Sequence, residues 1–242
     1  VIKSYIEKYE AKGYSLTYVF QNNSGQSVAI NNGLKLIKGE YLLWPDSDDY
    51  YSCIDSISIL IDAISSTDDS YGIVRCFLEY ENENSSRVYR KHSTTNPACY
   101  KENFFREAVF GSDCFWYVPG GFVLKVSHLR KILPDFEIFT HKEAGQNYQL
   151  LLPILFNYKC KTIGRFLYRV IEKENSHSRI ALNNCNMRLR QEYIYKKTLE
   201  KTIERIKMGE EDKNKLMEEI DFKYMRSNCY IHATFQRKEF KP

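Results

Sequence analysis

An apolar run that ends in a cluster of carboxylates narrows the choice of folds for this chain. Residues 41–44, Tyr-Leu-Leu-Trp, have the length and composition of a buried strand, and Asp46, Asp48 and Asp49 follow almost at once. Open α/β sheets bind their ligands just beyond the carboxyl ends of such strands. The sequence therefore predicts an α/β chain with a candidate site at residues 46–49.

Two interpretations of residues 46–49 compete. Asp and Ser after a strand often only form a turn and cap the next helix. Here Ser52 and Asp55 already supply a capping-box pattern for a helix with apolar positions at Ile54, Ile57, Ile61 and Ile64. An Asp-x-Asp turn also offers hard oxygen ligands to Mg²⁺ or Mn²⁺, which hold phosphate oxygens as well. Because the cap is supplied elsewhere, we favour the metal site.

The residues upstream of the carboxylates form an ordered pattern with them. Residues 23–34 are Asn-Ser-Gly-Gln-Ser-Val-Ala-Ile-Asn-Asn-Gly-Leu, and residues 38–41 are Lys-Gly-Glu-Tyr. In order and spacing this block resembles family 2 glycosyltransferases, whose pattern is an N-x-G-x-S-x-A-R-N helix, a K-G-E-Y/F turn, an apolar strand and D-x-D-D. The resemblance implies a fold of the GT-A type: an α/β, mostly parallel sheet flanked by helices, here with a helical C-terminal segment.

The resemblance also implies roles for individual residues. A divalent ion, Mn²⁺ or Mg²⁺, is expected on Asp46 and Asp48 together with the donor's diphosphate. The expected donor-binding residues are Asn23, Gly25, Asn31 and Asp46, and Asp49 is expected on the acceptor side. Ile30 stands where the family commonly has Arg, so any phosphate or ribose contact made by that Arg is missing.

Residues 115–125 resemble the acceptor-side segment of the family and contain the pair Gly120 and Gly121, which allows close backbone approach. Trp116 either stacks on a sugar ring or belongs to the core. Gln146 and Asn147 precede a helix with apolar positions at residues 151, 152, 155 and 156. Their amides are expected to hydrogen-bond sugar hydroxyls of the acceptor.

The same position usually carries the family's catalytic base, a carboxylate in an E-D or G-E-D sequence. An amide cannot accept the proton of the acceptor hydroxyl, so Gln146 and Asn147 cannot replace it. Glu143 lies about one helical turn earlier and is our candidate base, ahead of Asp135 and Glu137. The alternative for Glu143 is a surface charge near a helix N-terminus, where the helix dipole favours an anion.

Further apolar patterns predict strands at residues 16–20, 71–80 and 160–170 and two C-terminal helices joined near Gly209. We expect a GT-A-like domain over residues 1–180 and a helical C-terminal extension over residues 181–242. Family members usually open with a βαβ unit that recognises the nucleotide base. The resemblance implies that this chain, which starts at Val1, is N-terminally truncated and lacks that unit.

Composition narrows the function classes. The seven cysteines are odd in number and never spaced C-x-x-C, which argues for reduced thiols and against a zinc site or a disulfide framework. No apolar run reaches the length of a membrane span, and no signal peptide opens the chain. The expected localisation is cytoplasmic, with the inner membrane face as an alternative, because the net charge of +4 partly clusters towards the C-terminus.

The sequence thus predicts a metal-dependent, inverting glycosyltransferase. Its expected partners are a nucleotide-sugar donor, UDP-linked as the resemblance implies, and a saccharide or lipid-linked saccharide acceptor in surface polysaccharide or glycoconjugate synthesis, with no nucleic acid. Peripheral membrane association and a homodimer are open alternatives. The rival functions are a non-catalytic saccharide-binding or scaffold module and, with less support, a nucleotidyltransferase, which also uses paired carboxylates and a metal.

Overall fold

The computed structural model describes residues 2–143, 145, 147–173 and 184–239. The N-terminal segment forms a short 3₁₀ helix, η1 (Ile2–Tyr5), and α1 (Ile6–Glu10). The strand predicted at residues 16–20 is wrong: this segment pairs with no strand among the described residues. Val19 and Phe20 are 51% and 74% exposed. An apolar run becomes a strand only where a neighbouring backbone accepts and donates its hydrogen bonds.

The sheet is built from β1 (Tyr41–Leu42), β2 (Tyr50–Tyr51), β3 (Tyr71–Asn82), β4 (Val88–Arg90), β5 (Phe122–Lys125) and β6 (Lys159–Glu172). Its order is β1-β5-β3-β6-β2, and β4 pairs with β3 outside this path. The predicted α/β class with flanking helices is confirmed, but the sheet is mixed, not mostly parallel. Among the described strands, only β3 and β6 pair in parallel.

The parallel pair forms the spine of the sheet. β3 and β6 run side by side from Tyr71 opposite Lys159 to Asn82 opposite Glu172. A parallel pair needs a long crossover, and residues 83–158 supply it with several helices. β3 is buried on both faces from Gly72 to Tyr80, as a central strand must be. The predicted strands at residues 71–80 and 160–170 are both confirmed.

Helices cover both faces of this sheet. α2 (Gln26–Leu34), α3 (Ser56–Ser65), α4 (Phe105–Phe110), α5 (Val126–Ile132) and α6 (Asn147–Asn157) lie close to the strands, and short 3₁₀ turns, η2 (Pro97–Tyr100) and η3 (Pro119–Gly121), connect them. α3 begins at Ser56, later than the capping-box pattern predicted. Ile54 therefore precedes the helix and is 98% exposed, while Leu60 and Ile64 are fully buried.

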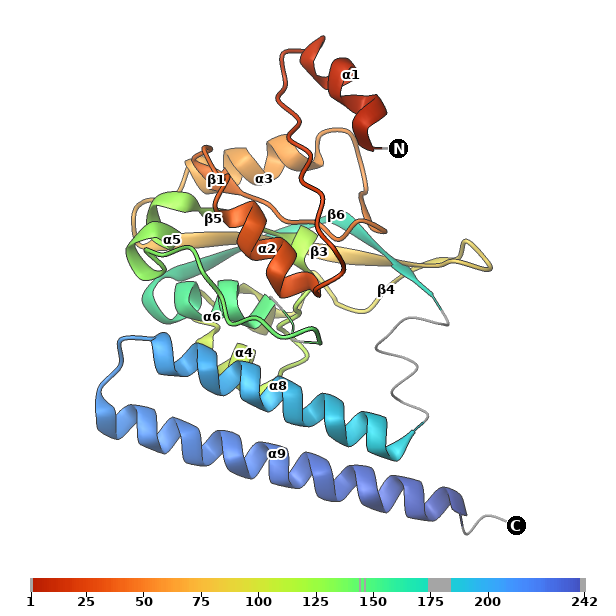
Figure 1. Ribbon diagram of the computed structural model, residues 1–242, viewed down its shortest axis with the longest axis vertical. Coiled ribbons are helices and arrows are strands. Elements are labelled where there is room, and N and C mark those ends of the chain that lie inside the picture. Colours follow the sequence, from red (N-terminus) through yellow and green to blue (C-terminus); the bar gives the residue numbers. More distant parts are fainter. Residues whose placement is uncertain (1, 144, 146, 174–183, 240–242) are drawn as a thin grey trace.

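Two long helices, α8 (Cys185–Arg205) and α9 (Glu210–Glu239), run antiparallel along one side of the molecule (Figure 1). They confirm the two helices predicted around Gly209. Leu199 and Ile203 of α8 and Ile220 of α9 are fully buried and belong to the same hydrophobic cluster as the strands. No helix among the described residues is long and apolar enough to cross a membrane.

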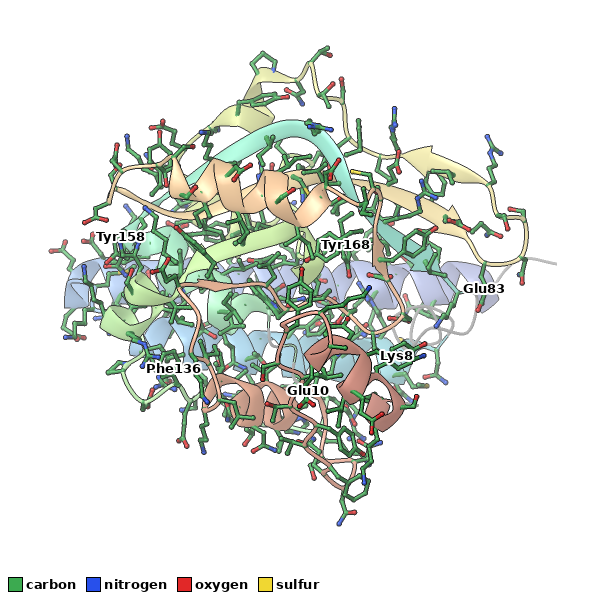
Figure 2. The ribbon with its side chains drawn as sticks, turned by 90° about the horizontal axis from the view of Figure 1, so that it is seen from above. Lys8, Glu10, Glu83, Phe136, Tyr158 and Tyr168 are labelled. Carbon is green, nitrogen blue, oxygen red and sulfur yellow. The ribbon has the colours of Figure 1, made fainter. Side chains whose placement is uncertain are left out.

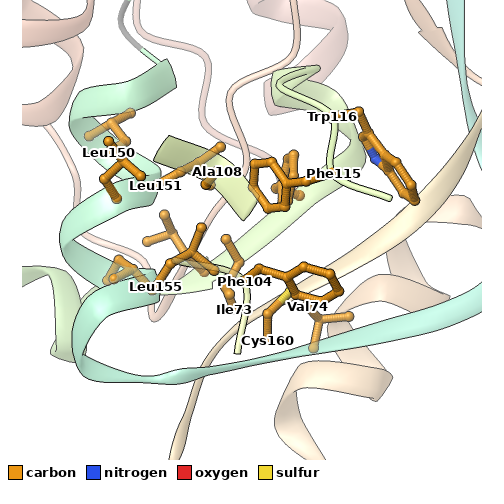
Figure 3. Packing of buried hydrophobic residues seen from close by; sticks show 14 of the residues in the cluster. Ile73, Val74, Phe104, Ala108, Phe115, Trp116, Leu150, Leu151, Leu155 and Cys160 are labelled. Atoms are coloured by element: carbon orange, nitrogen blue, oxygen red, sulfur yellow. The ribbon is translucent and has the colours of Figure 1, made fainter. Parts of the chain in front are cut away.

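The core lies between α6 and the β3–β6 spine (Figure 3). Leu150, Leu151 and Leu155 of α6 face Phe104 and Ile73 across it. Burial of each such side chain contributes roughly 1.5–3 kcal/mol, so this layer accounts for much of the hydrophobic stabilisation. Cys76, Cys99, Cys114 and Cys160 are buried here as free thiols.

An unusual member of this core is Arg75 on β3, which is fully buried and has no carboxylate partner in the part of the chain that the structure describes. One guanidinium nitrogen, Nη2, donates hydrogen bonds to the carbonyls of Cys99 and Cys114, both at 2.9 Å. The guanidinium plane also lies over the Phe104 and Trp116 rings, at 3.9 and 4.1 Å from their centroids. Arg75 therefore ties two loops to the central strand and closes one face of Trp116.

Candidate active site

The carboxylate cluster occupies the tight turn between β1 and β2. The turn closes through a hydrogen bond from the Asp49 N–H to the Asp46 carbonyl, at 3.3 Å. β2 then pairs antiparallel with β6, which places Tyr51 opposite Tyr168. The turn therefore sits beside the C-terminal end of a spine strand, the end at which α/β sheets bind ligands.

The end of β6 holds two of the three carboxylates. The Ile171 N–H donates to Asp49 Oδ1 at 2.9 Å. Lys173, just past the strand, donates from Nζ to Asp48 Oδ2 at 3.0 Å. Asp48 is exposed, whereas Asp46 and Asp49 are half-buried. Asp46 has no side-chain hydrogen-bond partner among the described residues.

The electrostatics of the turn are unfavourable for three ionised carboxylates. Burial, followed by the charges of Asp49 and Asp48, raises the pKa of Asp46 to about 6. Burial also raises the pKa of Asp49, and the hydrogen bond from Ile171 offsets only part of that. Desolvation and like charges both disfavour the ionised form, so the turn holds negative charge at a cost. A bound cation would remove that cost.

The donor set of the turn fits Mg²⁺ or Mn²⁺. Such ions are commonly held by one or two carboxylates, while water and substrate phosphates complete the coordination. Asp46 and Asp48 supply this number, and Asp49 keeps one oxygen on Ile171. Among the described residues, no group of three or more His, Cys, Asp or Glu could hold a metal ion by itself. The turn is thus suited to an ion that shares its coordination with a substrate.

Tyr168 of β6 forms a wall of the turn and lies near the middle of the molecule (Figure 2). It is fully buried, and burial together with the charges of Asp49 and Asp46 raises the pKa of its hydroxyl. A Cβ atom on Gly120 would lie 2.0 Å from the Tyr168 ring. Only glycine fits at residue 120, because backbone and ring are already in contact.

Trp116, Gly120 and Gly121, which were predicted to lie on the acceptor side, are buried in the structure. Gly120 and Gly121 are both buried, and a Cβ atom on Gly121 would lie 2.8 Å from Leu78 Cδ2. Trp116 is only 5% exposed and packs against Phe77, with its ring also close to His92. Protein covers the faces of the Trp116 ring in this conformation, so the residue packs in the core, and its contact with an acceptor sugar stays a prediction. These residues shape the core behind the turn.

Asn147 links the start of α6 to the segment that precedes the carboxylates. Its Oδ1 accepts a hydrogen bond from Trp44 Nε1 at 3.2 Å, and its Nδ2 donates to the Tyr117 carbonyl at 2.8 Å. Both ends of the amide are thus occupied by protein. Gln146, the other predicted acceptor contact, lies outside the described residues. Through Trp44, which is two residues before Asp46, the predicted base region and the carboxylate turn are brought together.

Glu143, the candidate base, is exposed and paired with Arg190 of α8. The two guanidinium nitrogens Nη2 and Nε donate to its carboxylate at 2.8 and 3.2 Å. The His141 Nδ1 atom accepts a hydrogen bond from the Glu143 N–H at 3.2 Å and orients the backbone. A bidentate arginine stabilises the ionised form, and a base must release that partner before it accepts a proton.

Two residues predicted to bind the donor, Gly25 just before α2 and Asn31 within it, contact the loop that carries Glu143. Asn31 Nδ2 donates to the Ile138 carbonyl at 3.0 Å, and the Ile138 N–H donates to Asn31 Oδ1 at 2.9 Å. Gly25 has a φ of +91°, and a Cβ atom there would lie 2.6 Å from the Lys142 carbonyl oxygen. Asn23 is exposed, and its Oδ1 accepts from the Gly25 N–H at 3.4 Å. Asn31 and Gly25 therefore position the loop that carries Glu143.

Sequence analysis missed two residues of the site, Tyr168 and Lys173. Tyr168 lies near the end of β6 and Lys173 just beyond it, both 122 or more residues past Asp46 along the chain. The Tyr-Arg pair at residues 168–169 closes a predicted strand, and strand ends are where α/β sheets gather ligand-binding groups. That signal identifies the edge of the sheet, but only the pairing of β2 with β6 brings it to the carboxylate turn.

Comparisons with known proteins identify the family and the fold of the chain. A family model described as Glycosyl transferase family 2 matches residues 2–133, more than half of the 242-residue chain. No curated protein matches the chain. Solved structures do: S. aureus TarS 1–349 in complex with UDP-GlcNAc superposes with a TM-score of 0.52 at 14% identity, over 93% of this chain and 60% of that one.

Two further structures show the same fold. S. aureus TarS 1–349 alone gives a TM-score of 0.53 at 14% identity, over 93% of this chain and 58% of that one. The mannosyltransferase PcManGT from Pyrobaculum calidifontis, in complex with GDP-Man and Mn²⁺, gives 0.51 at 14% identity, over 96% of this chain and 58% of that one. The chain therefore spans about three fifths of the length of these three structures.

Proposed function

Because this chain belongs to glycosyl transferase family 2, we propose that it transfers a sugar from a nucleotide-sugar donor, UDP-linked, to a saccharide acceptor. The observation that carries the proposal is the turn at residues 46–49, where Asp46 is held half-buried with a pKa of about 6. A chain gains nothing in stability from such crowding of carboxylates. Perturbed groups of this kind gather at functional sites.

Each residue of the turn has a proposed task. Asp46 and Asp48 would hold a divalent ion, Mn²⁺ or Mg²⁺, whose positive charge would stabilise the leaving diphosphate. Asp49 stays on the Ile171 N–H and fixes the shape of the turn on the acceptor side. Gly120 packs against the Tyr168 ring, which lies beside the turn. The carboxylates thus supply negative charge, and β6 holds them in position.

The chemical step requires a base for the acceptor hydroxyl. We assign this role to Glu143, which accepts the proton as the hydroxyl oxygen attacks the anomeric carbon from the face opposite the diphosphate, with inversion. Arg190 pairs with Glu143 in this structure, and the acceptor must displace that pair. The pair joins exposed side chains, so its loss costs only about 0.2–1 kcal/mol. The proposed products are UDP and an extended saccharide, which belongs to surface polysaccharide or glycoconjugate synthesis.

The test is calorimetric titration of the full-length protein with UDP, with and without Mn²⁺. We expect UDP binding that depends on Mn²⁺ and is lost in Asp48→Ala, while Asp113→Ala, which removes an exposed carboxylate away from the turn, binds as the wild type does. Glu143→Gln should keep UDP binding and lose at least about a hundredfold in transfer rate. Equal UDP affinity with Mn²⁺ and with chelator would contradict the proposed site.

A second candidate function is a non-catalytic saccharide-binding or scaffold module derived from a transferase. The pairing of Glu143 with Arg190 and the neutral amide of Asn147 at the usual position of the base favour it. The two functions differ in one observable. A scaffold module would bind saccharide without transferring a sugar, so Glu143→Gln would leave every measured property unchanged.

A further inference from the structure

Lys173 is the one cation that contacts the carboxylate turn among the described residues. It lies just beyond β6, two residues past Ile171, whose N–H holds Asp49. Its Nζ atom is 3.0 Å from Asp48 Oδ2. Among the charges near this ammonium, Asp48 is the one that raises the pKa of Lys173 most, and Glu83 and Asp49 add to it. The end of one strand therefore supplies both an anchor and a counter-charge to the turn.

The ion pair between Lys173 and Asp48 is exposed to water, so either partner can bind another ion. The side chain of Lys173 is 37% exposed and that of Asp48 is 50% exposed. Water screens such exposed pairs and weakens them, so Asp48 can leave Lys173 at little cost. The oxygen that Lys173 occupies belongs to the carboxylate assigned to the metal. An ammonium at hydrogen-bond distance and a divalent cation on the same carboxylate repel each other, so one displaces the other.

We propose that Lys173 is the resident counter-ion of Asp48, that a divalent ion displaces it, and that the displaced ammonium then binds the donor's diphosphate. The inference rests on the function proposed above and adds a residue that the sequence pattern does not mark. An ion on Asp48 that also held the diphosphate would bring the phosphates near the Lys173 ammonium, because that ammonium lies on the same carboxylate. The flexible four-carbon stem of a lysine spans such a shift without movement of the strand.

A counter-ion of this kind couples metal and donor binding. Without diphosphate, the metal must break the Lys173 pair and gains no new partner for the ammonium. With diphosphate present, the ammonium exchanges one anion for another, and the metal binds more tightly. By linkage, the factor by which UDP strengthens Mn²⁺ binding equals the factor by which Mn²⁺ strengthens UDP binding. Lys173 would thus disfavour a metal-loaded site that lacks its donor.

The experiment measures Mn²⁺ affinity of the full-length protein from the electron paramagnetic resonance signal of the free ion, with and without UDP. Lys173→Met removes the charge and keeps an unbranched side chain. Lys173→Arg keeps the charge. Lys161→Met removes the same charge from the other end of β6, where the side chain is exposed, and controls for net charge.

We expect Lys173→Met to bind Mn²⁺ about two- to fivefold more tightly than the wild type without UDP, and to lose most of the strengthening by UDP. Lys173→Arg and Lys161→Met should retain the wild-type behaviour. Unchanged Mn²⁺ affinity and unchanged coupling in Lys173→Met, with normal binding in the wild type, would overturn this inference alone. No Mn²⁺-dependent UDP binding in the wild type would overturn the proposed function as well.

Discussion

At the scale of single residues, the ionised form of Asp46 is unfavourable in the folded protein. It is half-buried, lacks a side-chain partner among the described residues and lies beside two other carboxylates, so its pKa rises from 3.8 to about 6. The folded protein binds a proton on Asp46 more tightly than the unfolded chain does. Proton binding at Asp46 therefore adds fully to the free energy of unfolding below about pH 4, and this contribution is lost as the pH rises through about 6.

Asp46→Asn should stabilise the metal-free protein at neutral pH. A shift from 3.8 to about 6 corresponds to roughly 3 kcal/mol before screening, and partial exposure reduces this to about 1–2 kcal/mol. Chemical denaturation in the presence of chelator at about pH 7 should show the gain, which should shrink by about pH 4. A variant less stable than the wild type at neutral pH would show that the ionised Asp46 has a favourable partner in the fold.

At the scale of elements, α2 acts as a clamp on the loop that precedes α6. Asn31 makes a reciprocal pair of hydrogen bonds with the backbone of Ile138. Ser27 does the same further along: its hydroxyl donates to the His141 carbonyl at 3.0 Å and accepts from the His141 N–H at 3.2 Å. Two side chains one helical turn apart therefore fix the loop in register with the helix.

Asn31→Ala should destabilise the protein by about 2 kcal/mol, because the N–H and carbonyl of Ile138, a residue only 4% exposed, lose their partners. Asn32→Ala is the matched control: it has the same helix propensity change but loses only one side-chain hydrogen bond, from Asn32 Nδ2 to Gln21 Oε1. Urea denaturation measures the difference, and amide hydrogen exchange should accelerate at residues 138–143. Equal stability of the two variants would remove the clamp.

At the scale of the whole molecule, α8 and α9 share the core of the sheet. Leu199, Ile203 and Ile220 are fully buried in one continuous cluster with β3 and α6. Lys223 of α9 also donates to the Val109 carbonyl of α4 at 2.7 Å. The predicted boundary between residues 180 and 181 lies outside the described residues, and its status as a domain boundary stays a prediction. The shared core favours one cooperative unit.

Ile203→Ala should destabilise the sheet region as well as the helices, by about 2–5 kcal/mol. Both tryptophans, Trp44 and Trp116, lie before α8, so their fluorescence reports on the sheet region while circular dichroism reports strongly on α8 and α9. Both probes should give one coincident transition that shifts together in the variant. Met187→Ala, at a half-exposed position of α8, should shift neither by more than about 0.5 kcal/mol. Separate transitions would instead support an independent extension.

Local patterns predicted the elements that are regular or deeply buried. The central strand at residues 71–80 is a long apolar run, and a buried central strand needs no particular neighbour to be recognised. The stretch at residues 16–20 has a similar local pattern, yet it forms no strand among the described residues, because strand pairing depends on backbone groups from elsewhere. The parallel or antiparallel direction of each pair likewise depends on distant segments.

The candidate site divides in the same way. Asp46, Asp48 and Asp49 lie within four residues, so one short segment indicated them by itself, together with the glycines and asparagines of the family pattern. Trp116 was ambiguous, because an aromatic ring before a strand serves a core or a sugar equally well, and only the positions of Arg75 and Phe77 decide for the core.

The sequence by itself determined the family, the α/β class and the carboxylate turn, since each rests on residues close together along the chain. Only the tertiary structure decided that Lys173 pairs with Asp48, that Arg190 pairs with Glu143 and that Gly120 must admit the Tyr168 ring. The physical reason is that contact energies act over a few ångströms in space. Residues far apart in the chain share them only after the sheet has brought their strands together.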